Sequence, residues 1–161
     1  MLRKIPFAVI LLISLAACKS KTAFNYSQDF VKKEQSLLPD LLSTGTKVSK
    51  YMAREQYDSV AAAGERMEKI IDAKLQEIKN QPAPDVKEGE NFKAAGVKYF
   101  SYMKSIYTSY KKIGNAKTTE ERNEEMNKLK QLTYQRVSVL QNMQAAQREY
   151  AKANGFRVEN K

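Results

Sequence analysis

The stretch Val60–Ile78, VAAAGERMEKIIDAKLQEI, decides the fold class. Its apolar residues recur every three or four positions, which is the period of one face of an α-helix. Charged side chains occupy the opposite face, as is typical of an amphipathic surface helix. The apolar positions are Val60, Gly64, Met67, Ile71, Leu75 and Ile78. We predict a helix from about Tyr57 to Lys79, which Pro82 and Pro84 end because proline cannot continue the hydrogen-bond ladder.

Helical periodicity also precedes this stretch. Apolar residues at helical spacing predict a helix from about Tyr26 to Ala53, in which Pro39 and Gly45 are expected to produce a kink or a split into two shorter helices. The chain then has to turn near Arg54 to Asp58, where Asp58 or a neighbour is a candidate cap for the next helix. The apolar positions of the first helix are Phe30, Val31, Leu37, Leu38, Leu41, Leu42, Val48 and Met52.

Two more helices follow the proline-containing loop. The third is expected to begin between Asp85 and Glu90, where Asp85-x-x-Glu88 resembles a capping box, and to continue to Ile113. Its predicted apolar face is Phe92, Gly96, Tyr99, Phe100, Met103, Tyr107 and Tyr110, with Tyr102 lying off that face. The fourth opens with the capping box Thr118-x-x-Glu121 and stops at Asn154-Gly155. Its predicted apolar face is Met126, Leu129, Thr133, Val137, Leu140, Met143, Gln147 and Tyr150.

Four amphipathic helices with mostly short connections predict an all-α protein, an antiparallel up-down four-helix bundle with a long C-terminal helix. That helix should measure roughly 50 Å against roughly 35–40 Å for the others, so we expect it to overhang the bundle or to curve around it. Gly64 and Gly96 are expected where two helices approach closely, and Phe156 is expected to fold back on the last turn of the fourth helix.

The composition narrows the chemistry available to the chain. It contains no histidine and no tryptophan, and Cys18 is its single cysteine. The lack of histidine removes the commonest catalytic base and metal ligand, and a single cysteine allows no internal disulfide. We therefore predict a non-enzymatic protein without a metal or another cofactor. An enzyme that uses carboxylates or tyrosine is a third, less favoured hypothesis.

The first eighteen residues have the order of an export signal. Arg3 and Lys4 are followed by an apolar run, Ile5 to Leu15, and then by the small residues Ala16 and Ala17. The run is about half of the roughly 20 residues that a transmembrane helix needs. Cys18 comes directly after the small residues, and an odd cysteine in an exported protein calls for an explanation.

Leu15-Ala16-Ala17-Cys18 resembles the signal of bacterial lipoproteins, in which a leucine-like residue and two small residues precede the cysteine. The alternative is an ordinary secretory signal with a cysteine nearby by chance. The resemblance implies cleavage between Ala17 and Cys18 and the attachment of up to three acyl chains, palmitate among them, to Cys18. It also implies the periplasmic leaflet of the outer membrane, because Lys19-Ser20-Lys21 lacks the aspartate of inner-membrane lipoproteins.

These observations divide the chain into four parts: a cleaved signal at 1–17, a lipidated tether at 18–24, the bundle at 25–155 and a polar tail at 156–161. Cleavage lowers the net charge from +10 to +8, because Arg3 and Lys4 leave without an acidic residue. Near the tether lie Lys19, Lys21, Lys32 and Lys33, which are either solvated or in contact with lipid phosphates. No basic stripe with a reading element stands out, so no nucleic-acid partner is expected.

The aromatic residues of the third helix are the most unusual chemistry of the body. Tyr99, Phe100, Met103, Tyr107 and Tyr110 either form part of the core or line a groove for a glycan or an apolar ligand. The acidic residues Glu120, Glu121, Glu124 and Glu125 are explained by the helix dipole without a metal. Our leading hypothesis is a cell-envelope lipoprotein whose bundle binds a protein partner or a cell-wall polymer at the membrane. The alternative is a small-ligand-binding bundle.

Overall fold

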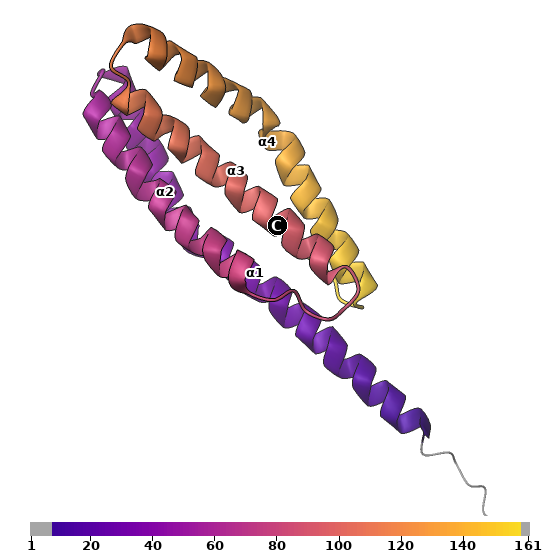
Figure 1. Ribbon diagram of the computed structural model, residues 1–161. Coiled ribbons are helices and arrows are strands. Elements are labelled where there is room, and N and C mark those ends of the chain that lie inside the picture. The colour runs from indigo at the N-terminus through magenta and orange to yellow at the C-terminus, as the bar shows by residue number, and fades with distance from the viewer. Residues whose placement is uncertain (1–7, 159–161) are drawn as a thin grey trace, which may run out of the picture.

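The computed structural model describes residues 8–158, and the side chains of residues 19–158. The charged start of the predicted signal, Arg3 and Lys4, lies outside the described residues, as does the end of the predicted tail, 159–161. Four helices make up the structure: α1 (Ala8–Ala53), α2 (Tyr57–Asn80), α3 (Gly89–Asn115) and α4 (Thr119–Ala153). They run up and down in sequence as an antiparallel four-helix bundle (Figure 1), which confirms the predicted fold class.

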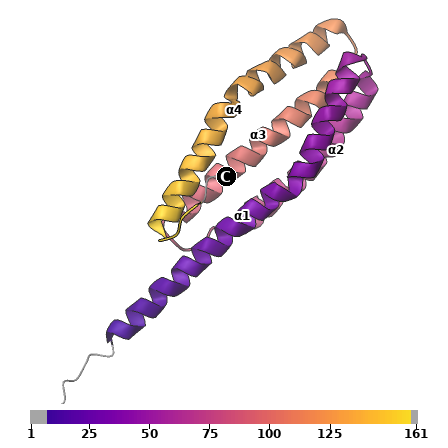
Figure 2. The same cartoon turned by 180° about the vertical axis from the view of Figure 1, so that it is seen from behind.

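The bundle has two ends. The turns 54–56 and 116–118 lie together at one, called here the distal end (Figure 1). The loop 81–88 and the C-terminal end of α4 lie at the other, called here the basal end. The N-terminal part of α1 projects beyond the basal end in both views (Figures 1 and 2). None of the helices, over the residues that the structure describes, is both long and apolar enough to cross a membrane.

α1 differs from its prediction at its start. It is one helix from Ala8 to Ala53, so residues 18–24 are helical where we predicted a tether. The physical reason is burial, because Ala23 is fully buried and the Tyr150 hydroxyl donates a hydrogen bond to its carbonyl oxygen. Pro39 and Gly45 do not split the helix, since Leu37 and Val48 on either side of them are buried.

Close approaches of helix backbones fix α2 against α3. A Cβ atom on Gly64 would lie 2.5 Å from the Lys111 backbone nitrogen, and one on Gly114 would lie 2.4 Å from the Ala61 backbone nitrogen. A Cβ on Gly96 would lie 2.5 Å from the Phe30 ring, which packs there from α1. The close helix approach predicted at Gly64 is therefore confirmed, whereas Gly96 makes room for an aromatic side chain and not for a neighbouring helix backbone.

The helix ends agree with prediction in α4 and disagree in α2 and α3. The Thr118 hydroxyl accepts a hydrogen bond from the Glu121 amide, and both halves of the predicted capping box are present. The other two predicted caps are wrong. α2 begins after Gln56, and α3 begins after Glu88, whose positive φ of 61° turns the chain into the helix, and neither residue caps with its side chain.

The C-terminal end of α4 closes as predicted. Gly155, with φ of 75°, lets the Phe156 amide donate to the Ala151 carbonyl, which is the pattern of a Schellman motif. Phe156 thereby folds back, and its ring lies 5.8 Å from that of Tyr150.

α4 curves over α3 along its length (Figures 1 and 2). Within α4, all of which the structure describes, only Met143, Tyr150 and Ala151 are buried. The predicted apolar face is wrong at Thr133 and Val137, which are exposed. The predicted Leu140 and Met143 do pack on the core, and Leu132 and Val139, which were not predicted, pack there too.

Candidate functional site

The predicted ligand face of α3 lies in the core. Phe100 is fully buried, and Tyr99, Met103 and Tyr107 are nearly so, while Tyr110 is half-buried. Tyr102, which we placed off this face, is buried too, and its hydroxyl donates to the Leu132 carbonyl at 2.9 Å. The reason is that α3 lies between α2 and α4, so that two of its faces are covered.

The buried tyrosines keep their protons. Burial raises the pKa of Tyr99, and so does the carboxylate of Glu34, which accepts a hydrogen bond from its hydroxyl at 2.7 Å. Burial raises the pKa of Tyr107 to about 12. Both side chains are therefore neutral near pH 7 and pack as aromatic rings with a satisfied or solvent-reaching hydroxyl.

One part of the predicted face still borders open space. A hollow of about 300 Å³ between α3 and α4 includes Tyr99 among its walls. It is lined by Asn91, Ala94, Ala95, Lys98, Tyr99, Val139, Asn142 and Met143. This α3–α4 hollow has the mixture of apolar and polar groups that small-molecule sites share, near the lower end of their usual size.

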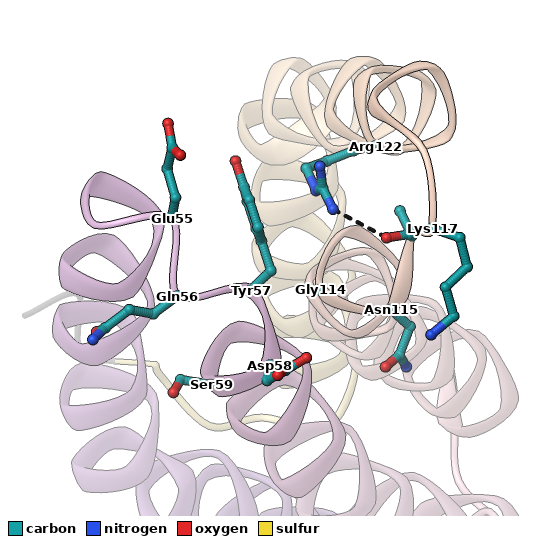
Figure 3. Close-up of a pocket in the computed structure, with 10 residues that line it drawn as sticks. Glu55, Gln56, Tyr57, Asp58, Ser59, Gly114, Asn115, Lys117 and Arg122 are labelled. Atoms are coloured by element: carbon teal, nitrogen blue, oxygen red, sulfur yellow. Dashed lines mark hydrogen bonds between the residues drawn. The ribbon is translucent and has the colours of Figure 1, made fainter.

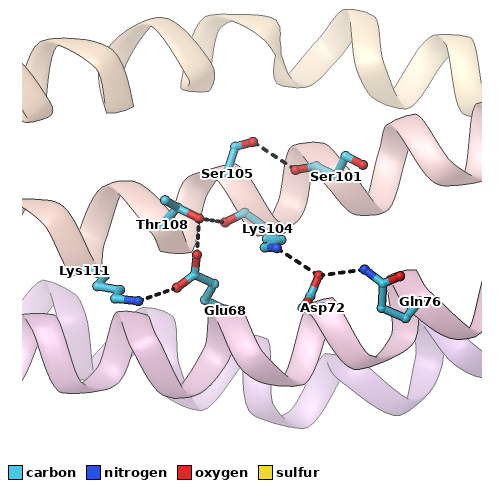
Figure 4. A network of polar contacts seen from close by, with 8 residues as sticks. All are labelled: Glu68, Asp72, Gln76, Ser101, Lys104, Ser105, Thr108 and Lys111. Carbon is cyan, nitrogen blue, oxygen red and sulfur yellow. Dashed lines mark hydrogen bonds and ion pairs between the residues drawn. The ribbon is translucent and has the colours of Figure 1, made fainter.

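A polar network joins α2 to α3 on the outside of the bundle (Figure 4). Glu68 accepts hydrogen bonds from the Thr108 hydroxyl at 2.7 Å and from the Lys111 ammonium at 3.1 Å. One turn along, Asp72 accepts from Lys104 at 2.8 Å. Periodicity could not reveal these pairs, because they depend on the register between two helices.

We predict that this network makes stability depend on acid pH. Burial acts to raise the pKa of Glu68, but the hydrogen bonds from Thr108 and Lys111 lower it by more. The hydrogen bond from Lys104 lowers the pKa of Asp72. A carboxyl whose pKa is lowered on folding stabilises the fold above its unfolded pKa, 4.5 for Glu and 3.8 for Asp. That contribution is lost as pH falls through the lower folded pKa.

The measurement is urea unfolding of the Glu68→Gln/Asp72→Asn variant at pH 7 and pH 3. We expect the variant to be less stable at pH 7 by about 0.2–1 kcal/mol per pair, which is usual for solvent-accessible ion pairs, and to lose less stability than the parent on acidification. Glu124→Gln, an exposed change, is the control. Equal losses on acidification in variant and parent would contradict the assignment.

The distal end carries a hollow of about 490 Å³ (Figure 3). The two turns that meet there line it, with Glu55 and Tyr57 on one side and Lys117 and Arg122 on the other. The guanidinium of Arg122 lies 3.8 Å from the Tyr57 ring centre and donates to the Ala116 carbonyl at 3.0 Å. Its Nε is buried and has no hydrogen-bond partner among the described residues.

Charges of both signs surround this distal hollow, since Glu55 and Asp58 oppose Lys117 and Arg122. A polar surface with a stacked arginine and tyrosine suits contact with another macromolecule, because both residue types are enriched in protein interfaces. No sequence signal pointed to it, since its residues are far apart in the chain and belong to no periodic face.

The predicted lipidation site lies at the other end. Cys18 belongs to α1, whose first described side chains lie along the basal end. Ser20 donates to the Asn154 carbonyl at 3.0 Å, and the rings of Phe24 and Phe156 lie 5.6 Å apart. Cys18 therefore lies two residues before Ser20, which contacts the C-terminal end of α4.

The acidic residues at 120–125 lie in the first two turns of α4, where they stabilise the start of that helix. Glu121 completes the capping box, and Glu125 forms an ion pair with Lys128 at 2.7 Å. Among the described residues, no three cysteine, histidine or acidic side chains converge on a point where they could hold a metal ion.

Comparison of the chain with protein-family models, with curated proteins and with solved structures found no match. Function has to be inferred from the chain's own residues.

Proposed function

We propose that this chain is a lipid-anchored protein of the bacterial cell envelope, acylated on Cys18, whose bundle binds a protein partner or an envelope polymer without catalysing a reaction. The pattern Leu15-Ala16-Ala17-Cys18 carries the anchor. Lys19-Ser20-Lys21 supports the periplasmic leaflet of the outer membrane as its location.

The observation that carries the proposal is that the cysteine and the bundle share one helix. Cleavage after Ala17 would shorten the N-terminal part of α1, which projects from the basal end (Figure 1), and would leave Cys18 as the first residue. The contacts of Ser20 and Ala23 with α4 follow within two turns. A bundle attached in this way stands on the membrane without a flexible linker, and α1 reaches as far as roughly 50 Å from the cysteine.

Partner binding is supported by the surface that such an arrangement presents. The distal hollow lies at the end away from the cysteine. Two pairs of exposed apolar side chains lie on the outer helices, Leu38 with Leu42 on α1 and Tyr134 with Val137 on α4. An anchor confines the protein to a surface and so raises its effective concentration toward a partner there.

The anchor is tested by fractionating cells that produce the parent or the Cys18→Ala variant. We expect the parent in the outer-membrane fraction, resistant to extraction with salt, because several acyl chains hold a protein firmly. The variant should lack the acyl chains and the processing that depends on them. Identical processing and equal membrane retention of the two proteins would contradict the proposal.

Partner binding is tested by a photo-crosslinking side chain in place of Tyr134, which is 72% exposed. We expect one specific adduct in cells, formed with the parent anchor and lost with Cys18→Ala. A crosslinker in place of Lys50, exposed on α1, is the matched control. The absence of a position-dependent adduct would remove support for binding along α4.

A second candidate function is the binding of a small glycan or apolar ligand, and the α3–α4 hollow favours it because Tyr99 and Met143 line it. Thermal unfolding in the presence of glycans, lipids and quinone-like compounds is the test. A ligand of this hollow should raise the melting temperature of the parent and not that of an Ala95→Leu variant, which fills the space. No stabilisation by any compound would contradict this function.

A further inference from the structure

A third hollow, of about 520 Å³ and called here the basal hollow, lies at the basal end around the last turn of α4. Three basic side chains line it, Arg148, Lys152 and Arg157, together with the half-buried ring of Phe156. All three are exposed, and none forms an ion pair within the described residues. The helix dipole favours a cation such as Lys152 in the last turn, but it does not explain Arg157, which lies beyond the helix.

Two of the four lysines that the sequence suggested for lipid contact are in a different situation. Lys19 pairs with Asp85 at 3.8 Å, and Lys33 pairs with Asp29. Their charges are offset by neighbours on the protein. Lys21 and Lys32 are exposed single charges on α1 without an ion pair among the described residues, whereas three unpaired basic side chains lie together at the C-terminal end of α4.

The basal hollow also lies beside the predicted lipidation site. The Ser20 hydroxyl bonds to Asn154, and the Phe24 ring packs against Phe156, a wall of the hollow. Cys18 precedes Ser20 by two residues, about 3 Å along the helix axis. A lipid on Cys18 would hold the hollow at the headgroup layer, and Phe24, 43% exposed, offers that layer an aromatic ring.

We propose that Arg148, Lys152 and Arg157 bind the phosphate of an anionic membrane lipid and so fix the orientation of the bundle on the membrane. This inference rests on the proposed anchor at Cys18. Arginine and lysine are the side chains that recognise phosphate, arginine through its planar fork of donors and lysine as a point charge. Their attraction to an anionic surface extends over about a Debye length and is weakened by salt.

The test uses the acylated protein in vesicles of phosphatidylcholine, with and without phosphatidylglycerol, and follows amide hydrogen exchange. We expect residues 148–158 to exchange more slowly only where phosphatidylglycerol is present. The difference should disappear at high salt and in the Arg148→Gln/Lys152→Gln/Arg157→Gln variant. The single variant Arg157→Gln, which changes only the residue beyond the helix, should lose part of the protection that phosphatidylglycerol gives. The control variant Lys47→Gln/Lys50→Gln/Arg54→Gln removes the same charge from exposed distal positions. It should retain the full protection of residues 148–158.

Equal exchange in both kinds of vesicle, or an equal effect of the control variant, would overturn the inference. Inorganic phosphate without vesicles is a separate arm. If it protected residues 148–158 as well as the lipid does, the assignment to a membrane lipid would be wrong.

The mass of the same sample separates this inference from the anchor. An acylated Cys18 without headgroup-dependent protection would overturn the lipid site and leave the anchor standing. If Cys18 carries no lipid, the anchor fails, and co-sedimentation with phosphatidylglycerol vesicles then tests the hollow. Salt-sensitive binding that falls roughly 100-fold in the triple variant, as three surface charges imply, would support the site, and no binding would overturn it.

Discussion

Tyr150→Ala is expected to destabilise the protein by about 3–5 kcal/mol, the range for removing a large aromatic side chain from a core. Tyr150 is fully buried, and its ring stacks on that of Phe92 at 4.7 Å. Its hydroxyl donates to the Ala23 carbonyl at 3.1 Å. One side chain thus connects α4 to α3 and to the Ala23 segment of α1, so its loss leaves a cavity and releases that segment.

Urea unfolding gives the free energy, and amide hydrogen exchange shows which segment is released. We expect faster exchange in residues 19–30 of α1 and little change in α2. Tyr150→Phe should cost only about 0.5–1.5 kcal/mol, the value of one hydrogen bond. Tyr134→Ala, on the same helix but 72% exposed, should change stability by less than about 0.5 kcal/mol. Equal effects of Tyr150→Ala and Tyr134→Ala would contradict this packing.

Gly64→Ala is expected to cost about 1–3 kcal/mol, although alanine is the better helix former. The new Cβ would lie 2.5 Å from the Lys111 nitrogen and 2.9 Å from the Tyr107 oxygen. Both are backbone atoms, so neither can rotate away, and α2 and α3 have to move apart.

Gly45→Ala is the matched control for this prediction. Gly45 lies inside α1, and a Cβ there would have no atom within 4 Å. The substitution should therefore stabilise the protein by about 0.5–1 kcal/mol. Urea unfolding of both variants shows directly whether each substitution raises or lowers the free energy of unfolding. Stabilisation by Gly64→Ala would contradict the close approach of α2 and α3.

The fold could be predicted from the spacing of apolar residues, because in α2 and α3 most residues at that spacing are the ones that the bundle buries. Val60, Met67 and Ile71 were predicted on one face and are buried together. The prediction was poorer for α4, where Val137 is 63% exposed. Polar residues interrupt the apolar positions of that helix, so two adjacent faces fit the pattern almost equally well, and only the packing on α3 chooses between them.

The start of α1 could not be predicted for a related reason. Residues 19–24 have no apolar stripe of their own, and Ala23 is buried in the assembled bundle, where Tyr150, 127 residues away, donates a hydrogen bond to its carbonyl oxygen. The distal and basal hollows depend in the same way on which turns and ends the topology brings together. The local sequence is enough to predict the helices and the Cys18 motif, whereas the distal and basal hollows form only when the bundle is assembled.

We propose above all that a lipid on Cys18 holds the bundle at the membrane. The most direct measurement is the mass of the protein purified from bacterial membranes, with fragmentation of its N-terminal peptide. We predict a chain that begins at Cys18 and carries acyl groups on that residue. A chain that begins elsewhere, or an unmodified Cys18, would contradict the claim.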